Sequence, residues 1–194
     1  MKYELLVFDW DGTLLDSAGA IVRAIQAACR DLDLPIPPDR QARHVIGLGL
    51  VDAMRHAVPD LPPERYQEMA DRYRLHYLSG DHELTLFEGV PEMLANLWQA
   101  GHVLAIATGK SRIGLERALD HSGLRHLFQA SRCADECHSK PHPQMLEELM
   151  AEFGMANSAT VMIGDTSHDL LMASNACVDG LAVTYGAHPH DHLL

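Results

Sequence analysis

Short apolar segments bounded by polar or glycine residues recur along this sequence and predict buried β-strands. Helical patterns occupy the stretches between them, at 91–100, 113–122, 143–153 and 168–176. Strands that alternate with helices favour a parallel sheet covered by helices on both faces, so we expect an α/β fold. Four strands are expected at 4–8, 103–107, 160–163 and 181–184, and a weaker fifth at 128–132.

The stretch 17–86 breaks this alternation. It has helical patterns at 18–32, 49–57 and 63–78, with prolines between them and no convincing strand. We therefore expect an all-helical cap domain at 17–86, inserted into a catalytic core formed by 1–16 and 87–194. The two hinges are expected near 14–16 and 80–88.

Charge and hydropathy exclude several classes of partner. The 194 residues carry a net charge of −12, which argues against nucleic acid or an anionic membrane surface as a partner. No apolar run approaches the roughly 18 residues that would span a bilayer. The first residues do not resemble a signal peptide, because the apolar run is short and ends in an acid. A cytoplasmic location is the expectation.

Polar side chains follow all the expected strands except the one at 181–184. Asp9 and Asp11 follow the first strand, Asp165 follows the 160–163 strand, and Lys140 follows the weak one. Ligands of an open parallel sheet bind beyond the carboxyl ends of its strands. Any one of these residues could be a turn or cap residue, but their convergence at several strand ends favours a functional site.

This set of residues suits phosphoryl transfer. Asp9 and Asp165 can hold Mg²⁺ while leaving positions for water and a phosphate oxygen. Asp9 can then attack phosphorus and form an aspartyl-phosphate. Asp11 can protonate the leaving oxygen and later deprotonate the water, and Lys140 adds a fixed positive charge. The phosphate-binding candidates belong to the turns after the strands: Gly12, Thr13, Thr108, Gly109 and Lys110.

Four segments resemble the motifs of the haloacid dehalogenase superfamily, in the family's order. They are Asp9-Trp10-Asp11-Gly12-Thr13-Leu14-Leu15-Asp16-Ser17, Thr108-Gly109-Lys110, Lys140-Pro141-His142-Pro143 and Gly164-Asp165-Thr166-Ser167-His168-Asp169. The resemblance implies a Rossmann-like core and Mg²⁺ held by Asp9, the backbone carbonyl of Asp11, and Asp165. It places Asp169 in the second shell of the metal or against Lys140.

The inserted cap is similar to that of phosphoglycolate phosphatases, which makes 2-phosphoglycolate the first candidate among small phosphorylated metabolites. The segment 45–50, with Gly47, resembles the cap loop that reaches the active site. Dehalogenases lack an acid at the position of Asp11, and carbon–phosphorus hydrolases need a cap lysine, which 17–86 does not contain. A phosphosugar mutase, which could use Arg43 and His44, and a pyrophosphatase remain as alternatives. Arg43 is otherwise an ordinary solvated helix residue.

Several features favour a plainer interpretation. Cys133-x-x-x-Cys137-His138 has no second ligand pair and is interpreted as a loop, as is the terminal tract 188–192 with its three histidines. His168 is interpreted as a helix-start residue whose ring faces the cap. A non-catalytic binding protein on this fold would usually have lost one of Asp9, Asp11 and Asp165. All three are present, which disfavours that alternative. Relatives usually continue past the last strand, whereas this sequence ends at residue 194, after all the motif residues.

Overall fold

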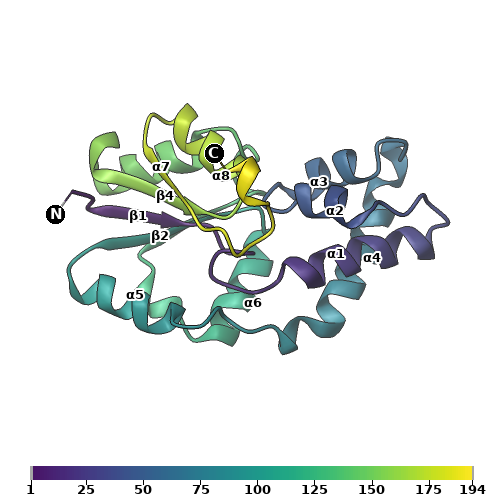
Figure 1. Cartoon of the computed structure of the whole chain (residues 1–194), viewed down its shortest axis with the longest axis horizontal. Coiled ribbons are helices and arrows are strands. Elements are labelled where there is room, and N and C mark those ends of the chain that lie inside the picture. The colour runs from purple at the N-terminus through teal and green to yellow at the C-terminus, as the bar shows by residue number, and fades with distance from the viewer. Residues whose placement is uncertain (1, 194) are drawn as a thin grey trace.

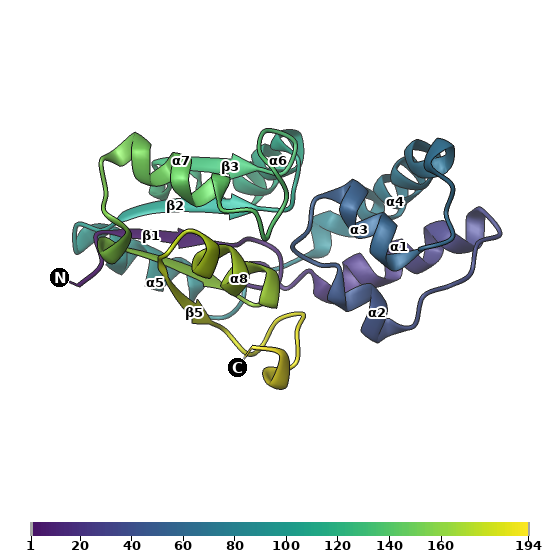
Figure 2. The same cartoon turned by 90° about the horizontal axis from the view of Figure 1, so that it is seen from above.

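A five-stranded, fully parallel sheet forms the centre of the protein in a computed structural model that describes residues 2–193 (Figures 1 and 2). Its strands run in the order β3-β2-β1-β4-β5, and β1 pairs with both β2 and β4. The chain adds β2 and β3 on one side of β1 and then crosses to the other side, which creates a topological switch point between β1 and β4. The strands are β1 Leu5–Phe8, β2 Val103–Thr108, β3 Ala130–Cys133, β4 Thr160–Gly164 and β5 Asp179–Ala182.

Helices cover both faces of the sheet, as the alternating pattern predicts (Figure 1). Helices α5 (Val90–Gln99) and α6 (Arg112–Ser122) pack on one face, and α7 (Gln144–Phe153) and α8 (Ser167–Asn175) on the other. Alternate residues of the central strands supply the two cores, because side chains of a strand point to opposite faces in turn. Leu6 and Phe8 pack with α5 and α6, whereas Leu5 and Val7 pack with α7 and α8.

The last strand differs from its sequence prediction. It spans Asp179–Ala182 instead of 181–184, and its first three residues are exposed. An edge strand pairs on one side only, so its hydrophobic pattern is a weak guide to its position. The weak strand candidate also exists, displaced to Ala130–Cys133.

Residues between β1 and α5 form a separate helical unit beside the carboxyl ends of the strands (Figure 2). It contains α1 (Ala18–Asp31), α2 (Asp39–His44), α3 (Leu50–Ala57) and α4 (Tyr66–Gly80), the last preceded by a 3₁₀ turn at Pro63–Arg65. The helices enclose a hydrophobic cluster of their own, with Ile25, Met54 and Met69 fully buried. Helix α2 was absent from the sequence prediction, because six residues carry too little periodicity to detect.

Two connecting segments join this unit to the sheet and run side by side. The Asp16 N–H donates to the Thr85 carbonyl at 3.0 Å, and the Phe87 N–H donates to the Leu14 carbonyl at 3.0 Å. The helical unit is therefore connected to the sheet through two adjacent segments of the chain. Among residues 2–193, no helix combines the length and apolar character needed to cross a membrane.

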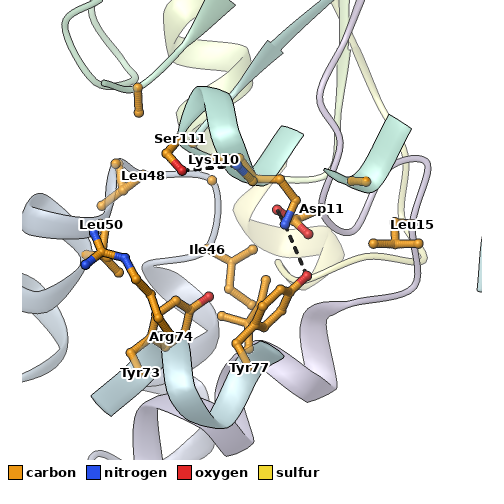
Figure 3. A pocket seen from close by; sticks show the side chains of 18 of the residues that line it. Asp11, Leu15, Ile46, Leu48, Leu50, Tyr73, Arg74, Tyr77, Lys110 and Ser111 are labelled. Carbon is orange, nitrogen blue, oxygen red and sulfur yellow. Dashed lines mark hydrogen bonds and ion pairs between the residues drawn. The ribbon is translucent and has the colours of Figure 1, made fainter. Parts of the chain in front are cut away.

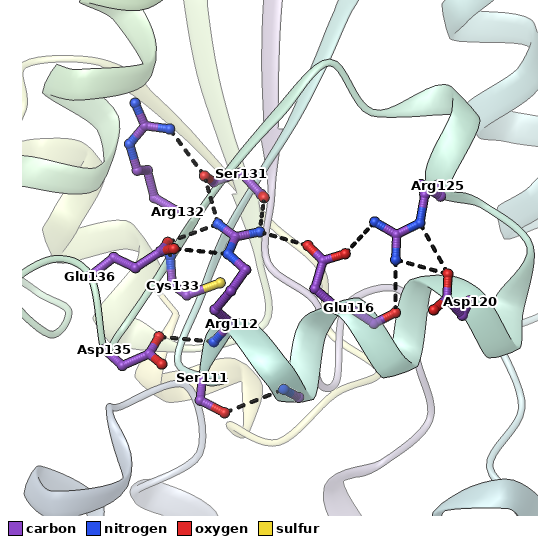
Figure 4. A network of polar contacts seen from close by, with 11 residues as sticks. Ser111, Arg112, Glu116, Asp120, Arg125, Ser131, Arg132, Cys133, Asp135 and Glu136 are labelled. Carbon is purple, nitrogen blue, oxygen red and sulfur yellow. Dashed lines mark hydrogen bonds and ion pairs between the residues drawn. The ribbon is translucent and has the colours of Figure 1, made fainter.

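A polar network fixes the start of α6 against β3 (Figure 4). Arg112 donates to Glu116 and Glu136 at 3.1 and 2.7 Å, and to the Ser131 hydroxyl at 2.7 Å. Cys133 is buried beside this network at the end of β3, and Cys137 lies in the loop that follows. The network holds the turn after β2, which carries residues 108–110.

Candidate active site

The turn after β1 places two carboxylates at the switch point. Asp9 is 1% exposed and Asp11 7% exposed. The Leu14 N–H donates to the Trp10 carbonyl at 3.0 Å, and the Gly12 N–H donates to the Leu15 carbonyl at 2.8 Å. These bonds close the chain into a tight turn directly after the strand, so both aspartates stay at the carboxyl edge of the sheet.

Three buried aspartates meet at this edge. Oxygens of Asp9, Asp165 and Asp169 lie within 4.8 Å of one another. The Lys140 ammonium donates to Asp9 Oδ1 and to Asp169 Oδ1, each at 2.7 Å. Asp9 Oδ2 is buried without a hydrogen-bond partner in the part of the chain that the structure describes. A buried carboxylate oxygen is costly to leave unpaired, so this atom is available to a bound cation or a substrate.

Asp169 is fully engaged by the protein. Its Oδ2 accepts from the Thr166 N–H at 3.0 Å and from the Thr166 hydroxyl at 2.6 Å, in a capping box that opens α8. Its Oδ1 accepts from Lys140. Both oxygens are thus occupied, and Asp169 contacts Lys140, one of the two positions that the family resemblance implies.

Asp165 sits in a tightly fitted cradle. It accepts from the Thr13 hydroxyl at 2.9 Å and from the Ala187 N–H at 2.6 Å. A Cβ atom on Gly12 would lie 2.2 Å from Asp165 Oδ2, and one on Gly186 would lie 2.3 Å from it. The Thr13 side chain, expected among the phosphate contacts, therefore orients this carboxylate.

The cluster carries an excess of buried negative charge. Burial raises the pKa of Asp9 well above its usual value, and the charges of Asp169 and Asp165 raise it further. Burial and Asp169 raise the pKa of Asp165 to about 7. Burial alone would lower the pKa of Lys140, but Asp169 and Asp9 raise it overall. Three carboxylates face one ammonium, which contacts only two of them, and this excess of negative charge fits a small hard divalent cation with oxygen ligands.

Asp11 faces the space between the sheet and the helical unit (Figure 3). Its Oδ2 lies 3.0 Å from the Lys110 ammonium, and its Oδ1 accepts from the Ser17 hydroxyl at 2.7 Å. Lys110 also donates to the hydroxyl of Tyr77, on α4, at 3.1 Å. A lysine expected to bind phosphate thus joins the Asp11 carboxylate to the helical unit.

A cavity of about 1310 Å³ opens over these residues, between the helical unit and the sheet edge. Asp9, Asp11, Lys110 and both glycines 47 and 109 line it, together with apolar side chains that include Ile46, Leu48 and Leu50. The loop at 45–50 touches the core, because a Cβ on Gly109 would lie 2.6 Å from the Gly47 carbonyl oxygen. Thr108 is buried, and its hydroxyl accepts from the Lys110 N–H at 3.2 Å. Arg43 lies on α2, half-buried, outside the described lining.

Two features of the structure were not predicted from the sequence: the tyrosines that line one side of the cavity, and a cluster of histidines. Tyr77 and Tyr73 stack at 5.8 Å on α4, one turn apart, and their spacing resembles that of ordinary core residues. The terminal tract was interpreted as a loop for want of a matching ligand set, but the fold brings His44 and His168 against His188. His168 faces the helical unit, and its Nε2 lies 2.7 Å from the His44 carbonyl oxygen.

Carboxylates and a lysine at the switch point of a parallel sheet, beneath a helical unit, form an arrangement suited to phosphoryl transfer. Residues 6–183 match the family model of haloacid dehalogenase-like hydrolases, and the chain belongs to that family. The probable phosphatase IndB of Dickeya dadantii is 38% identical, with 97% of this chain and 84% of that protein covered. A phosphoglycolate phosphatase of Aliivibrio fischeri is 33% identical, and the match covers 94% of this chain and 85% of that protein. The crystal structure of a predicted phosphoglycolate phosphatase from Haemophilus somnus has a TM-score of 0.85 at 25% identity, with 96% and 88% covered.

Proposed function

We propose that this phosphatase is Mg²⁺-dependent and hydrolyses a small phosphate monoester through an aspartyl-phosphate on Asp9. The observation that carries the proposal is the environment of Asp9: one oxygen is held by Lys140, and the other is buried without a hydrogen-bond partner among residues 2–193. Asp9, the backbone carbonyl of Asp11, and Asp165 would hold the cation. Bound Mg²⁺ would offset the carboxylate charge and stabilise charge on the phosphate oxygens.

The residues around Asp9 have separate tasks in this proposal. Asp9 attacks phosphorus in line and expels the leaving oxygen. Asp11 gives that oxygen a proton and afterwards takes one from the water that opens the acyl phosphate. Lys140 favours the ionised form of the Asp9 carboxylate and fixes its position, and Asp169 fixes Lys140. The turns at 12–13 and 108–110 supply the phosphate-binding groups.

The helical unit is the cap in this proposal, with the bounds 17–86 that the sequence indicates. Closure of the cap over the cavity would exclude water from the phosphoryl group until Asp11 activates one molecule. The paired segments at Leu14–Phe87 and Asp16–Thr85 form the hinge about which it closes.

Hydrolysis of p-nitrophenyl phosphate tests the mechanism. We expect activity in Mg²⁺, none in EDTA, and a loss of roughly 10³-fold or more in Asp9→Asn. Borohydride reduction of acid-quenched enzyme should convert an acyl phosphate at Asp9 into homoserine, which mass spectrometry detects. Equal activity of wild type and Asp9→Asn, or phosphate trapped on another residue, would refute the mechanism.

For the substrate, we propose 2-phosphoglycolate first, supported by the resemblance to phosphoglycolate phosphatases. The cavity of about 1310 Å³ exceeds the usual range of roughly 300–1,000 Å³ for small-molecule pockets, so larger esters also fit. Specificity constants for 2-phosphoglycolate, sugar phosphates, nucleoside monophosphates and pyrophosphate rank the candidates. A flat profile would reject a dedicated phosphoglycolate phosphatase and favour a broad one.

A further inference from the structure

Four histidines gather where the cap meets the core, beside the segments that carry Asp165 and Asp169. His44 ends α2, His168 lies in the first turn of α8, and His188 and His192 follow β5. The ring centres are 5.3 Å apart for His44 and His168, 5.0 Å for His44 and His188, and 5.2 Å for His168 and His188. His192 lies 6.2 Å from His44 and 6.0 Å from His188. Three separate segments of the chain thus bring their imidazoles to one point.

We propose that His44, His168 and His188 form a binding site for a transition-metal cation, Zn²⁺ first, that joins the cap to the core. One ligand nitrogen from each ring lies within 4.8 Å of the other two. Imidazoles that share a tetrahedral zinc at about 2.0–2.1 Å have ring centres roughly 5 Å apart, as these three have. Imidazole donors select zinc and similar metals over Mg²⁺, which prefers oxygen.

The rings are poised as neutral ligands. Burial lowers the pKa of His188 to about 4, and it also lowers the pKa values of His168 and His44. In the structure, the Nε2 atoms of His168 and His188 lie 2.7 and 3.1 Å from the same His44 carbonyl oxygen. The two nitrogens therefore already converge, and a cation between them would replace that shared oxygen.

The groups behind His188 can support metal binding. The Ser167 N–H donates to His188 Nδ1 at 3.0 Å, and the Ser167 hydroxyl lies 3.3 Å from the same nitrogen. When Nε2 binds a metal, the ring proton moves to Nδ1. The Ser167 N–H must then give up its present hydrogen bond to Nδ1, and the Ser167 hydroxyl becomes the acceptor. Such an outer hydrogen bond fixes the tautomer and direction of a metal-bound imidazole. The His44 ring is exposed and can rotate toward the metal, and His192 or water can complete the coordination.

Zinc at this site would restrain the cap. His44 is in the cap and directly precedes the loop at 45–50, whereas His168 and His188 belong to the core. A cation shared by both parts opposes their separation and slows exchange of substrate and product. Only this inhibitory consequence rests on the proposed function; zinc binding itself does not.

Equilibrium dialysis of the full chain against Zn²⁺ in excess Mg²⁺ tests the site, with bound metal measured by elemental analysis. We expect one zinc per chain in wild type and at least about tenfold weaker binding in His44→Ala and His188→Gln. His44 is exposed, so His44→Ala decides the result if the buried His188 variant does not fold. His138→Ala is the matched control, because His138 and His142 form another close pair, at 4.5 Å, without a third ring in the described contacts.

Asp9→Asn locates the metal independently of catalysis. It should bind zinc as wild type does, although it lacks a carboxylate of the active site. Unchanged zinc affinity in His44→Ala overturns the proposal, as does loss of zinc in Asp9→Asn or His138→Ala instead. Substitution of Co²⁺ for Zn²⁺ gives a second readout, since its visible spectrum should change on binding to wild type and not to His44→Ala.

Discussion

The Tyr77 hydroxyl, on the cap helix α4, accepts a hydrogen bond from the Lys110 ammonium at 3.1 Å. Lys110 lies 3.0 Å from Asp11, the proposed general acid and base (Figure 3). The cap therefore reaches the acid–base residue through one lysine. Such a contact links the position of the cap to the charge that Asp11 experiences.

Removal of this contact should slow the chemistry. Tyr77→Phe deletes one hydrogen bond to a charged group, so kcat/KM should fall about tenfold, by roughly 1.5 kcal/mol. The loss should be larger for an alkyl phosphate than for p-nitrophenyl phosphate, because only the alkoxide needs a proton from Asp11. Tyr73→Phe is the control, since its hydroxyl makes no hydrogen bond with the described residues. Equal effects of the two variants on both substrates would contradict this role of Tyr77.

Lys140 should carry far more stability than an exposed lysine. Lys140→Met leaves Asp9 and Asp169 buried without their shared ammonium, which should lower the free energy of unfolding by about 3 kcal/mol or more. Lys2→Met removes an ion pair with Asp179 whose side chains are 71% and 57% exposed, so its cost should be far smaller than that of Lys140→Met. Urea unfolding in EDTA measures both, and similar midpoints in the two variants would disprove the expected difference.

A comparison of alanine substitutions at Gly12 and Gly101 separates the effect of a steric clash from that of backbone strain. Its φ is +85°, and a Cβ there would lie 2.2 Å from Asp165 Oδ2. Gly12→Ala should therefore displace Asp165 and abolish Mg²⁺-dependent activity. Gly101 has a similar φ of +89°, and apart from its chain neighbours no atom of residues 2–193 lies within 4 Å of its Cβ position, so Gly101→Ala should cost only about 1–2 kcal/mol of stability and retain activity. If the activity of Gly12→Ala were close to that of Gly101→Ala, the close fit of Gly12 against Asp165 would not be needed for activity.

His188 should make the metal-free protein less stable in acid. Burial lowers its pKa to about 4 from an ordinary 6.5, so the unfolded chain binds more protons between these pH values. Its contribution to stability is complete above pH 6.5 and is lost as the pH falls toward 4. Between pH 7 and pH 5, the free energy of unfolding of wild type should fall by on the order of 1 kcal/mol more than that of His188→Gln. Urea titrations in EDTA check this, and parallel pH profiles would exclude His188 as the source.

Local signals in the sequence were sufficient for most of the fold. Strands β1, β2 and β4 are buried on both faces, so their apolar runs are clear, and their predicted ranges differ from the structure by one residue at most. The edge strand β5 was misplaced by two residues, and the six-residue helix α2 was not predicted. Both depend on contacts with distant residues more than on their own composition.

The sequence by itself determined where the strands occur along the chain, the inserted helices and the aspartates that follow the strands, because each has a local pattern. Only the tertiary structure decided which oxygen of Asp9 has no hydrogen-bond partner within the described part of the chain, and that the Thr13 hydroxyl donates to Asp165. It also decided that Lys110 joins Asp11 to Tyr77 and that His44 meets His188. These pairs lie far apart in the chain, and no periodicity records a contact between segments that meet only when the cap packs against the core.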